Sequence, residues 1–283
     1  MSVPARVGVL GGGRMGAGIA HAFVVAGADV VVVERDDPAA LAAHGRVSGA
    51  LHKSVERGST TEPLQALLDR VRISTDYAAF AGCSLVVEAV PEDPGLKEAA
   101  LAAVEERLAD GAWLATNTSS LSVAGLARVL KRPSEFCGLH FFNPVPASTL
   151  IEVVLGPDTS EATAAAARGW VEALGKTPVV VRDAPGFASS RLGVALALEA
   201  MRMVEEGVAS PDDIDTAMVL GYKHPVGPLR TTDIVGLDVR LGIAEYLEST
   251  LGGRFSPPQI LRDKVARGEL GRKSGKGFFE WND

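Results

Sequence analysis

The chain has 283 residues, of which 47% are hydrophobic and 22% charged, and its formal net charge is −7. The apolar content excludes a globally disordered chain, and the length favours two domains over one. The negative charge and the lack of runs rich in Lys and Arg argue against a nucleic-acid-binding protein.

The two cysteines, Cys83 and Cys137, lie in apolar sequence. This setting is typical of reduced thiols in a core and not of a disulfide framework or a metal site. The N-terminal residues lack the charged and apolar regions of a signal peptide, and no uninterrupted apolar run reaches the roughly 18 residues of a membrane span. We therefore expect a cytoplasmic protein with no bound metal and no membrane association.

The first part of the chain alternates short β-branched segments with segments of helical composition. The predicted strands are residues 7–10, 30–33, 71–74, 85–89, 113–115, 135–140, 151–155 and 179–181. The predicted helices are residues 15–26, 39–56, 63–70, 94–108 and 161–174. This alternation predicts an α/β fold with a mainly parallel, doubly wound sheet covered on both faces.

The pattern changes at Asp183-Ala184-Pro185-Gly186, beyond which no strand is expected. The predicted helices there are residues 187–206, 211–220, 237–250 and 258–267. Ser210 followed by Pro211 is a strong helix start, because Ser caps free N–H groups and Pro suits the first turn. We therefore predict two domains, an α/β domain over residues 1–183 and an all-helical domain over residues 184–283.

Gly11, Gly13 and Gly16 follow the first predicted strand and open the first helix, which is the context of a dinucleotide-binding loop. Glu34 ends the second strand about 20 residues on, where a carboxylate can accept hydrogen bonds from ribose hydroxyls. The same charge would repel a 2′-phosphate, so NAD is favoured over NADP. Arg35 could partly offset that repulsion. The alternative is a chance set of glycines at a tight turn. The first domain is thus predicted to be Rossmann-like and to bind NAD.

His140 ends a predicted strand and Glu152 follows a short way downstream. An imidazole with a pKa near ~6.5 can take a proton from an alcohol at neutral pH if a carboxylate fixes its tautomer. The pair therefore outlines a general-base site. The alternative is a core histidine at the end of a strand.

The order of these motifs resembles the L-3-hydroxyacyl-CoA dehydrogenases, particularly the short single-function 3-hydroxybutyryl-CoA type, over nearly the whole chain. The motifs that carry the resemblance are residues 7–16 (VGVLGGGRMG), 87–92 (VEAVPE), 117–121 (NTSSL), 140–144 (HFFNP), 185–187 (PGF), 224–228 (HPVGP) and 271–275 (GRKSG).

The resemblance implies NAD-dependent oxidation of (S)-3-hydroxyacyl-CoA to 3-oxoacyl-CoA, a reaction of fatty-acid β-oxidation. It assigns the base to His140, its carboxylate partner to Glu152 and a contact with the substrate oxygen to Ser119. Without the resemblance, Ser119 could instead cap the next helix. The resemblance also implies a homodimer formed through the helical domain.

The family's cofactor pocket maps onto residues that lie along both predicted domains. Besides the three glycines and Glu34, they are Arg14, Met15, Ala89, Glu92, Lys97, Asn117, Ser119, Asn143 and Lys273. Glu92 and Lys97 could instead form a solvated pair at a helix start. Asn143 could serve only the turn before Pro144, and Lys273 could lie in a flexible surface turn.

Two departures concern the substrate. Ser190 stands where many relatives have an asparagine near the substrate, and a hydroxyl cannot offer the paired donor and acceptor of an amide. Coenzyme A is expected to meet Lys53 and Arg57, which share one helix face, but Ala50 replaces a serine expected nearby. The alternative is that Lys53 and Arg57 are ordinary charges on an amphipathic surface helix.

Two other functions remain open at this point. A free hydroxy acid or sugar acid, as in gulonate-type and carnitine-type relatives, would use the same His-Glu pair. A non-catalytic NAD-binding protein would need neither Ser119 nor His140, because binding alone requires no general base.

Overall fold

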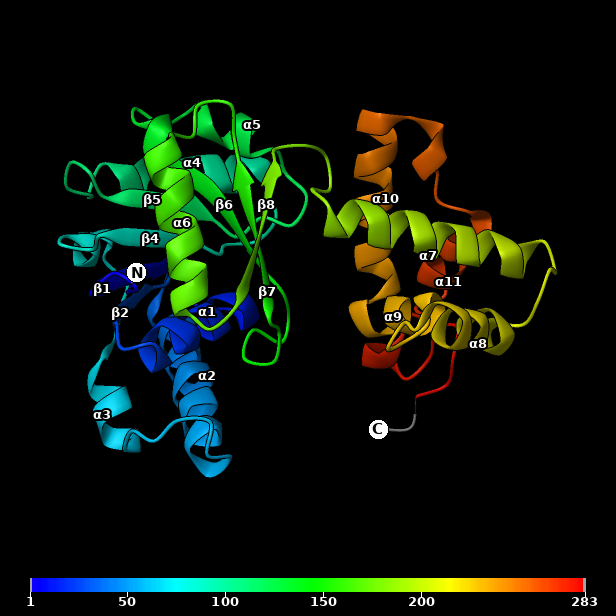
Figure 1. Ribbon diagram of the computed structural model, residues 1–283, viewed down its shortest axis with the longest axis horizontal. Helices are drawn as coiled ribbons and strands as arrows, with labels where there is room; N and C mark the ends of the chain where they lie inside the picture. The colour runs from blue at the N-terminus through cyan, green and yellow to red at the C-terminus, as the bar shows by residue number, and fades with distance from the viewer. Residues whose placement is uncertain (1, 282–283) are drawn as a thin grey trace. The chain divides into compact units, whose positions relative to one another are not determined.

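The computed structural model describes residues 2–281, which form two compact units that divide between Ala184 and Pro185 (Figure 1). Each unit has its own hydrophobic core. Within the described residues, no helix has the length and apolar character needed to cross a bilayer. Cys83 and Cys137 are buried free thiols, and burial raises the pKa of Cys137 to about 12.

The first unit is built on a single sheet. Its strands are β1 (Arg6–Leu10), β2 (Asp29–Val33), β3 (Val71–Ser74), β4 (Leu85–Glu88), β5 (Trp113–Thr116), β6 (Phe136–Phe141), β7 (Leu150–Leu155) and β8 (Thr177–Arg182). The order across the sheet is β3-β2-β1-β4-β5-β6-β7-β8, and only the β6–β7 pair is antiparallel. The order reverses between β1 and β4, the switch point at which doubly wound sheets bind nucleotides. The predicted Rossmann-like sheet is confirmed.

Helices lie on both faces of this sheet (Figure 1). They are α1 (Arg14–Val25), α2 (Asp37–Glu56), α3 (Leu64–Asp69), α4 (Pro94–Glu105), α5 (Val123–Ala127) and α6 (Glu161–Ala173), with 3₁₀ turns η1 (Tyr77–Phe80) and η2 (Pro133–Glu135). Val7 and Val9 of β1 belong to the core that includes residues of α1, α2 and α6. Gly8 points to the other face, where a Cβ would lie 2.6 Å from the ring of Phe80. Both faces are thus buried, which explains the nearly continuous apolar strands.

The second unit is helical, as predicted. Its helices are α7 (Ser189–Glu205), α8 (Pro211–Tyr222), α9 (Pro228–Val235), α10 (Leu237–Leu251) and α11 (Gln259–Ala266), with 3₁₀ turns η3 (Gly253–Phe255) and η4 (Arg272–Ser274). Ser210 caps α8 as expected, since its Oγ accepts a hydrogen bond from the Asp213 N–H at 3.2 Å. Extended pairing among the described residues of this unit is limited to two isolated bridges at Lys276.

Two helices were not predicted. Helix α5 has only 5 residues, too few to show a helical period. Its cap is Ser122, whose Oγ accepts from the Gly125 N–H at 3.0 Å, so the alternative that Ser119 caps this helix is wrong. Helix α9 depends on a distant residue, because the carboxylate of Asp215 accepts from the N–H groups of Leu229 and Arg230, each at 2.8 Å.

Candidate active site

Three glycines of the loop between β1 and α1 each have a different structural role. Gly11 has a positive φ of 89°, and a Cβ there would lie 2.9 Å from the carbonyl oxygen of Ala89. A Cβ on Gly16 would lie 1.7 Å from the carbonyl oxygen of Gly11, so only glycine lets α1 approach the loop. A Cβ on Gly13 would meet no protein atom within 4 Å. The open side of the loop at the helix N-terminus therefore fits a pyrophosphate.

A pocket of about 640 Å³ lies beside this loop. It is lined by Leu10, Gly11, Gly13, Arg14, Met15, Val33, Glu34, Arg35, Ala39, Arg46, Tyr77, Ala89, Val90, Pro91, Leu96 and Ala100. Glu34 Oε1 accepts a hydrogen bond from the Gly12 N–H at 2.7 Å, which fixes the carboxylate at the end of β2. An acid held beside the glycine loop and an apolar wall fit the adenosine part of a dinucleotide.

Two polar residues of this pocket were missed from the sequence. Arg46 of α2 donates from Nη1 to the carbonyl oxygen of Gly12 at 3.2 Å, and Tyr77 reaches the pocket from η1. Neither belongs to a local motif, so only the packing of α2 and η1 brings them to the loop. Arg35 forms an ion pair with Asp36 at 2.9 Å, which reduces its capacity to offset the charge of Glu34.

His140 and Glu152 occupy paired positions of β6 and β7. Nδ1 of His140 lies 2.8 Å from Oε2 of Glu152, and the residues are 6% and 1% exposed. With the carboxylate ionised, Nδ1–H donates to Glu152 and the imidazole lone pair lies on Nε2. A buried imidazole oriented in this way can act as a general base.

Ser119 follows β5, and several donors around it converge on one carboxylate. Glu92 Oε1 accepts from the Ser119 N–H at 2.8 Å, from Thr118 Oγ1 at 2.6 Å and from the Ser120 N–H at 3.1 Å. Because β1, β4, β5 and β6 run parallel, their carboxyl ends meet at one edge of the sheet. Ser119 and His140 therefore lie along the same sheet edge as the glycine loop.

Lys97 of α4 is enclosed. The residue is 1% exposed, and its Nζ lies 2.7 Å from Glu88 Oε1, 3.3 Å from Glu92 Oε2 and 3.2 Å from the carbonyl oxygen of Val90. The alternative of a solvated pair between Glu92 and Lys97 is therefore wrong, because the pair exists but its lysine is buried. Burial alone would raise the pKa of Glu92, but the charge of Lys97 and the bond from Thr118 lower it.

The two asparagines differ in their surroundings. Asn117 Oδ1 accepts from the Phe141 N–H at 2.9 Å, which ties the loop after β5 to the end of β6. Asn143 is exposed, precedes a cis peptide bond to Pro144 and follows Phe142, whose ring centroid lies 4.5 Å from that of His140. Asn117 is thus engaged by the backbone, whereas the Asn143 side chain faces solvent.

The remaining predicted residues lie on helices and turns outside the dinucleotide pocket. Lys53 and Arg57 are exposed at the end of α2, and within residues 2–281 neither forms an ion pair. In the helical unit, Ser190 lies in the first turn of α7. Lys273 pairs with Asp238 at 2.6 Å; burial would raise the pKa of Asp238, but the bond from Lys273 lowers it.

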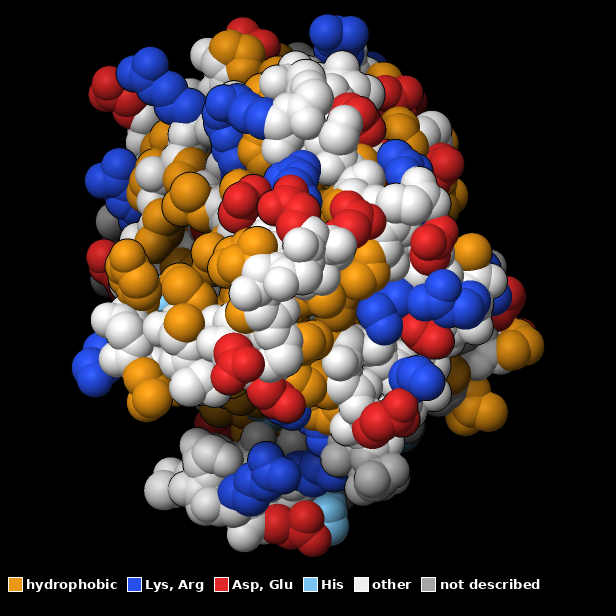
Figure 2. All heavy atoms as spheres, turned by 90° about the vertical axis from the view of Figure 1, so that its right-hand side faces the viewer, with side chains coloured by type: hydrophobic (Ala, Val, Ile, Leu, Met, Phe, Trp, Pro, Cys, Tyr) orange, Lys and Arg blue, Asp and Glu red, His pale blue; other side chains and the backbone are white. Residues whose placement is uncertain are grey.

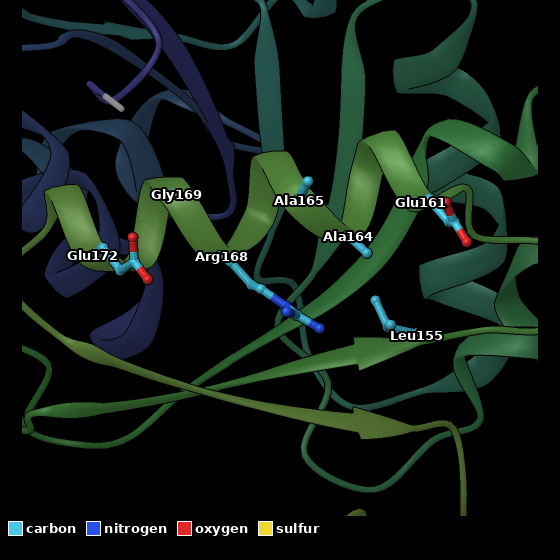
Figure 3. Close-up of a pocket in the computed structure, with 7 residues that line it drawn as sticks. All are labelled: Leu155, Glu161, Ala164, Ala165, Arg168, Gly169 and Glu172. Atoms are coloured by element: carbon cyan, nitrogen blue, oxygen red, sulfur yellow. The ribbon is translucent and has the colours of Figure 1, made fainter.

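A second depression of about 560 Å³ lies along α6. Figure 3 shows Arg168 pointing into it from that helix, with Leu155 opposite. Its other lining residues are Glu161, Ala164, Ala165, Gly169 and Glu172. None of these is a predicted site residue. The residues that line this depression include no Ser, Thr, Cys or His.

Known protein families match this chain over nearly its whole length. Residues 6–184 match the model of the 3-hydroxyacyl-CoA dehydrogenase NAD-binding domain, and residues 186–281 match that of the 3-hydroxyacyl-CoA dehydrogenase C-terminal domain. A probable 3-hydroxybutyryl-CoA dehydrogenase of Deinococcus radiodurans is 41% identical over 98% of this chain and 100% of its own length.

Two further proteins are similar along their full length. A 3-hydroxybutyryl-CoA dehydrogenase of Mycobacterium tuberculosis is 40% identical over 98% of each chain. The crystal structure of an (S)-3-hydroxybutyryl-CoA dehydrogenase from Ralstonia eutropha superposes with a TM-score of 0.94 at 37% identity, over 99% of this chain and 100% of that chain.

Proposed function

Because this chain belongs to the 3-hydroxyacyl-CoA dehydrogenase family, we propose that it interconverts (S)-3-hydroxyacyl-CoA and 3-oxoacyl-CoA with NAD, with 3-hydroxybutyryl-CoA as the expected substrate. In the direction of oxidation, the C3–H bond breaks with its electron pair as a hydride and the hydroxyl loses a proton. NAD, when bound, supplies the hydride acceptor. The products are 3-oxoacyl-CoA, NADH and one proton.

The hydrogen bond between His140 and Glu152 carries this proposal. Nε2 of His140 takes the proton of the C3 hydroxyl, and the carboxylate of Glu152 stabilises the imidazolium that forms. In reverse, the imidazolium returns the proton to the ketone. The Ser119 hydroxyl donates a hydrogen bond to the oxygen that gains charge. The Ser119 N–H donates to Glu92 Oε1 at 2.8 Å and the Ser119 hydroxyl lies 3.3 Å from the same oxygen, so the hydroxyl turns from Glu92 to donate to the substrate.

Residues away from the sheet edge are proposed to bind the rest of the substrate and the cofactor. Lys53 and Arg57 bind phosphate groups of coenzyme A, since both are exposed cations without an ion pair among residues 2–281. The helical unit holds the acyl part, with Ser190 as a polar contact. Asn143 and Lys273 contribute to the dinucleotide site.

The helical unit also mediates a homodimer. Large apolar side chains of this unit are exposed, among them Leu192 at 71%, Leu220 at 66% and Tyr222 at 75%. Figure 2, viewed from the side of this unit in Figure 1, shows hydrophobic side chains gathered between charged ones. Exposed apolar surface of this kind favours a protein interface.

We also propose that the enzyme works in the cytoplasm.

A steady-state panel tests the reaction. We expect oxidation of NADH by acetoacetyl-CoA and, more weakly or not at all, by free acetoacetate or by oxidised sugar acids. NADPH should be a poorer reductant than NADH, because Glu34 repels a 2′-phosphate. Turnover of free 3-oxo acids without turnover of acetoacetyl-CoA would favour the hydroxy-acid alternative instead.

A further inference from the structure

Arg46 of α2 is a cation that lines the dinucleotide pocket. Its side chain is exposed and borders the cavity of about 640 Å³ beside the glycine loop. Nη1 donates a hydrogen bond to the carbonyl oxygen of Gly12 at 3.2 Å. Among residues 2–281 the guanidinium forms no ion pair with a carboxylate. Its positive charge is therefore available to an anionic group of a ligand in the pocket.

The close contact between α2 and the glycine loop brings this arginine to the pocket. Ala43 is fully buried, and a Cβ on Gly12 would lie 2.4 Å from the Cβ of Ala43. The two small residues thus let the helix touch the loop. Arg46 lies three residues after Ala43, at a neighbouring position on the helix surface. A long side chain at this position reaches the carbonyl oxygen of Gly12.

Arg46 and Glu34 contact the same residue from opposite charges. Glu34 Oε1 accepts a hydrogen bond from the Gly12 N–H at 2.7 Å, whereas Arg46 donates to the carbonyl oxygen of Gly12. In dinucleotide-binding folds, a carboxylate at the end of the second strand binds the 2′-hydroxyl of the adenosine ribose. A group attached to that 2′-oxygen therefore meets the carboxylate of Glu34 with a guanidinium close by.

Arg35, which follows Glu34 directly, is neutralised at the start of α2. Its Nε pairs with Oδ2 of Asp36 at 2.9 Å, and Oδ1 of the same carboxylate accepts from the Ala39 N–H at 2.8 Å as the cap of the helix. Asp37 adds a second acid in the first turn. The structure therefore favours Arg46 over Arg35 as the residue that offsets the charge of Glu34.

We propose that Arg46 binds the 2′-phosphate of NADP and NADPH, and thereby limits the preference for NAD that Glu34 creates. This inference rests on the proposed function, which assigns a dinucleotide to the pocket. A guanidinium donates paired hydrogen bonds to phosphate oxygens, and an arginine near the ribose can accommodate a 2′-phosphate. NADPH remains the weaker ligand, because Glu34 lines the same pocket.

The test measures the binding of NADH and NADPH to the full-length protein by fluorescence titration, without any substrate. Arg46→Met should weaken NADPH binding by about tenfold to a hundredfold, as for the loss of a hydrogen bond to a charged group. The affinity for NADH should be largely kept. Arg35→Met should leave the ratio of the two affinities nearly unchanged, because Arg35 is already paired with Asp36.

Calorimetry with adenosine 2′,5′-bisphosphate and adenosine 5′-monophosphate isolates the adenosine half of the ligand. Arg46→Met should weaken only the bisphosphate, which carries the 2′-phosphate.

Two further variants separate the charge of Arg46 from its contact with the loop. Arg46→Gln keeps a donor for the carbonyl oxygen of Gly12 without the charge, and should lose affinity for NADPH as Arg46→Met does. Arg107→Met removes an exposed arginine that follows α4 and does not line the pocket, and should leave both affinities unchanged. Thermal unfolding of each variant confirms that it folds.

The outcomes distinguish the role of Arg46 from the proposed function. If neither dinucleotide binds the wild type, the proposed cofactor itself fails. If NADH binds and Arg46→Met weakens NADH and NADPH equally, or neither, the role of Arg46 is overturned while the dehydrogenase stands. Retained NADPH affinity in Arg46→Gln also overturns it, because the side chain then acts only through the loop.

A wild type that binds NADH but not NADPH moves the comparison to Glu34→Ala. Adding Arg46→Met to that variant should cause the same loss of NADPH affinity, and no loss there overturns the role of Arg46.

Discussion

Nδ1 of His140 lies 2.8 Å from Oε2 of Glu152 because the two residues are paired across the antiparallel strands β6 and β7. This register sets both side chains on the same face of the sheet at the distance of a hydrogen bond. Backbone pairing thus positions the carboxylate that fixes the tautomer of the imidazole.

The first prediction concerns this base. His140→Gln should lower kcat by about 10²- to 10⁴-fold, the usual contribution of a general base, while NADH affinity is largely kept. Stopped-flow or steady-state rates and NADH fluorescence titration give the two values. His44→Gln, an exposed histidine of α2, should behave as the unmodified enzyme. Full activity of His140→Gln would remove the histidine from the mechanism.

The second prediction concerns the choice of dinucleotide. Glu34→Ala should narrow or reverse the preference for NAD over NADP, by about tenfold to a hundredfold, since a charged hydrogen-bond acceptor is lost. The ratio of kcat/KM for NADH and NADPH is the measurement. Asp69→Ala, an exposed acid at the end of α3, is the control. An unchanged ratio in Glu34→Ala would exclude Glu34 from cofactor selection.

The third prediction concerns the buried pair of Lys97 and Glu88. Lys97→Met should lower the free energy of unfolding by about 3–5 kcal/mol, because Glu88 becomes an uncompensated buried charge. Urea denaturation measures the change. A double variant, Lys97→Met with Glu88→Gln, should recover part of the loss.

Lys131→Met offers a matched control for the buried lysine, since that side chain is 77% exposed and its loss should change stability by less than about 0.5 kcal/mol. Equal effects of Lys97→Met and Lys131→Met would contradict the structural role of the buried lysine.

The fourth prediction concerns His21 of α1, whose Nε2 lies 2.7 Å from Ser54 Oγ. Burial, and secondarily the charge of Lys176, lowers the pKa of His21 below 6.5. The folded protein therefore prefers the neutral imidazole. Its stabilising contribution is fully present above the unfolded pKa of about 6.5 and is lost as pH falls towards the lower folded value.

Urea denaturation at pH 7.5 and pH 5.5 checks this. The wild type should lose stability between the two values, and His21→Gln should show a smaller loss because position 21 no longer titrates. His44→Gln should keep the wild-type dependence. If His21→Gln and the wild type lose equal stability on acidification, the lowered pKa of His21 does not contribute to the pH dependence of stability.

Local chemistry made much of the dinucleotide site predictable. Gly11, Gly13 and Gly16 are required by a turn, an open approach and a close helix contact, and each requirement applies within a few residues. The position of Glu34 was predictable because the second parallel strand ends at the same edge of the sheet as the glycine loop. Arg46 was missed because its contact with Gly12 spans two elements and has no sequence pattern.

The sequence by itself determined the alternation of strands and helices, the change to helices after residue 183 and the chemical identity of the groups that could react. These follow from residue size, polarity and backbone freedom, which act locally. Only the tertiary structure decided that the hairpin between β6 and β7 aligns His140 with Glu152 and that Lys97 is buried between two acids. Strand register and burial depend on which distant segments pack together, and no stretch of sequence contains that information alone.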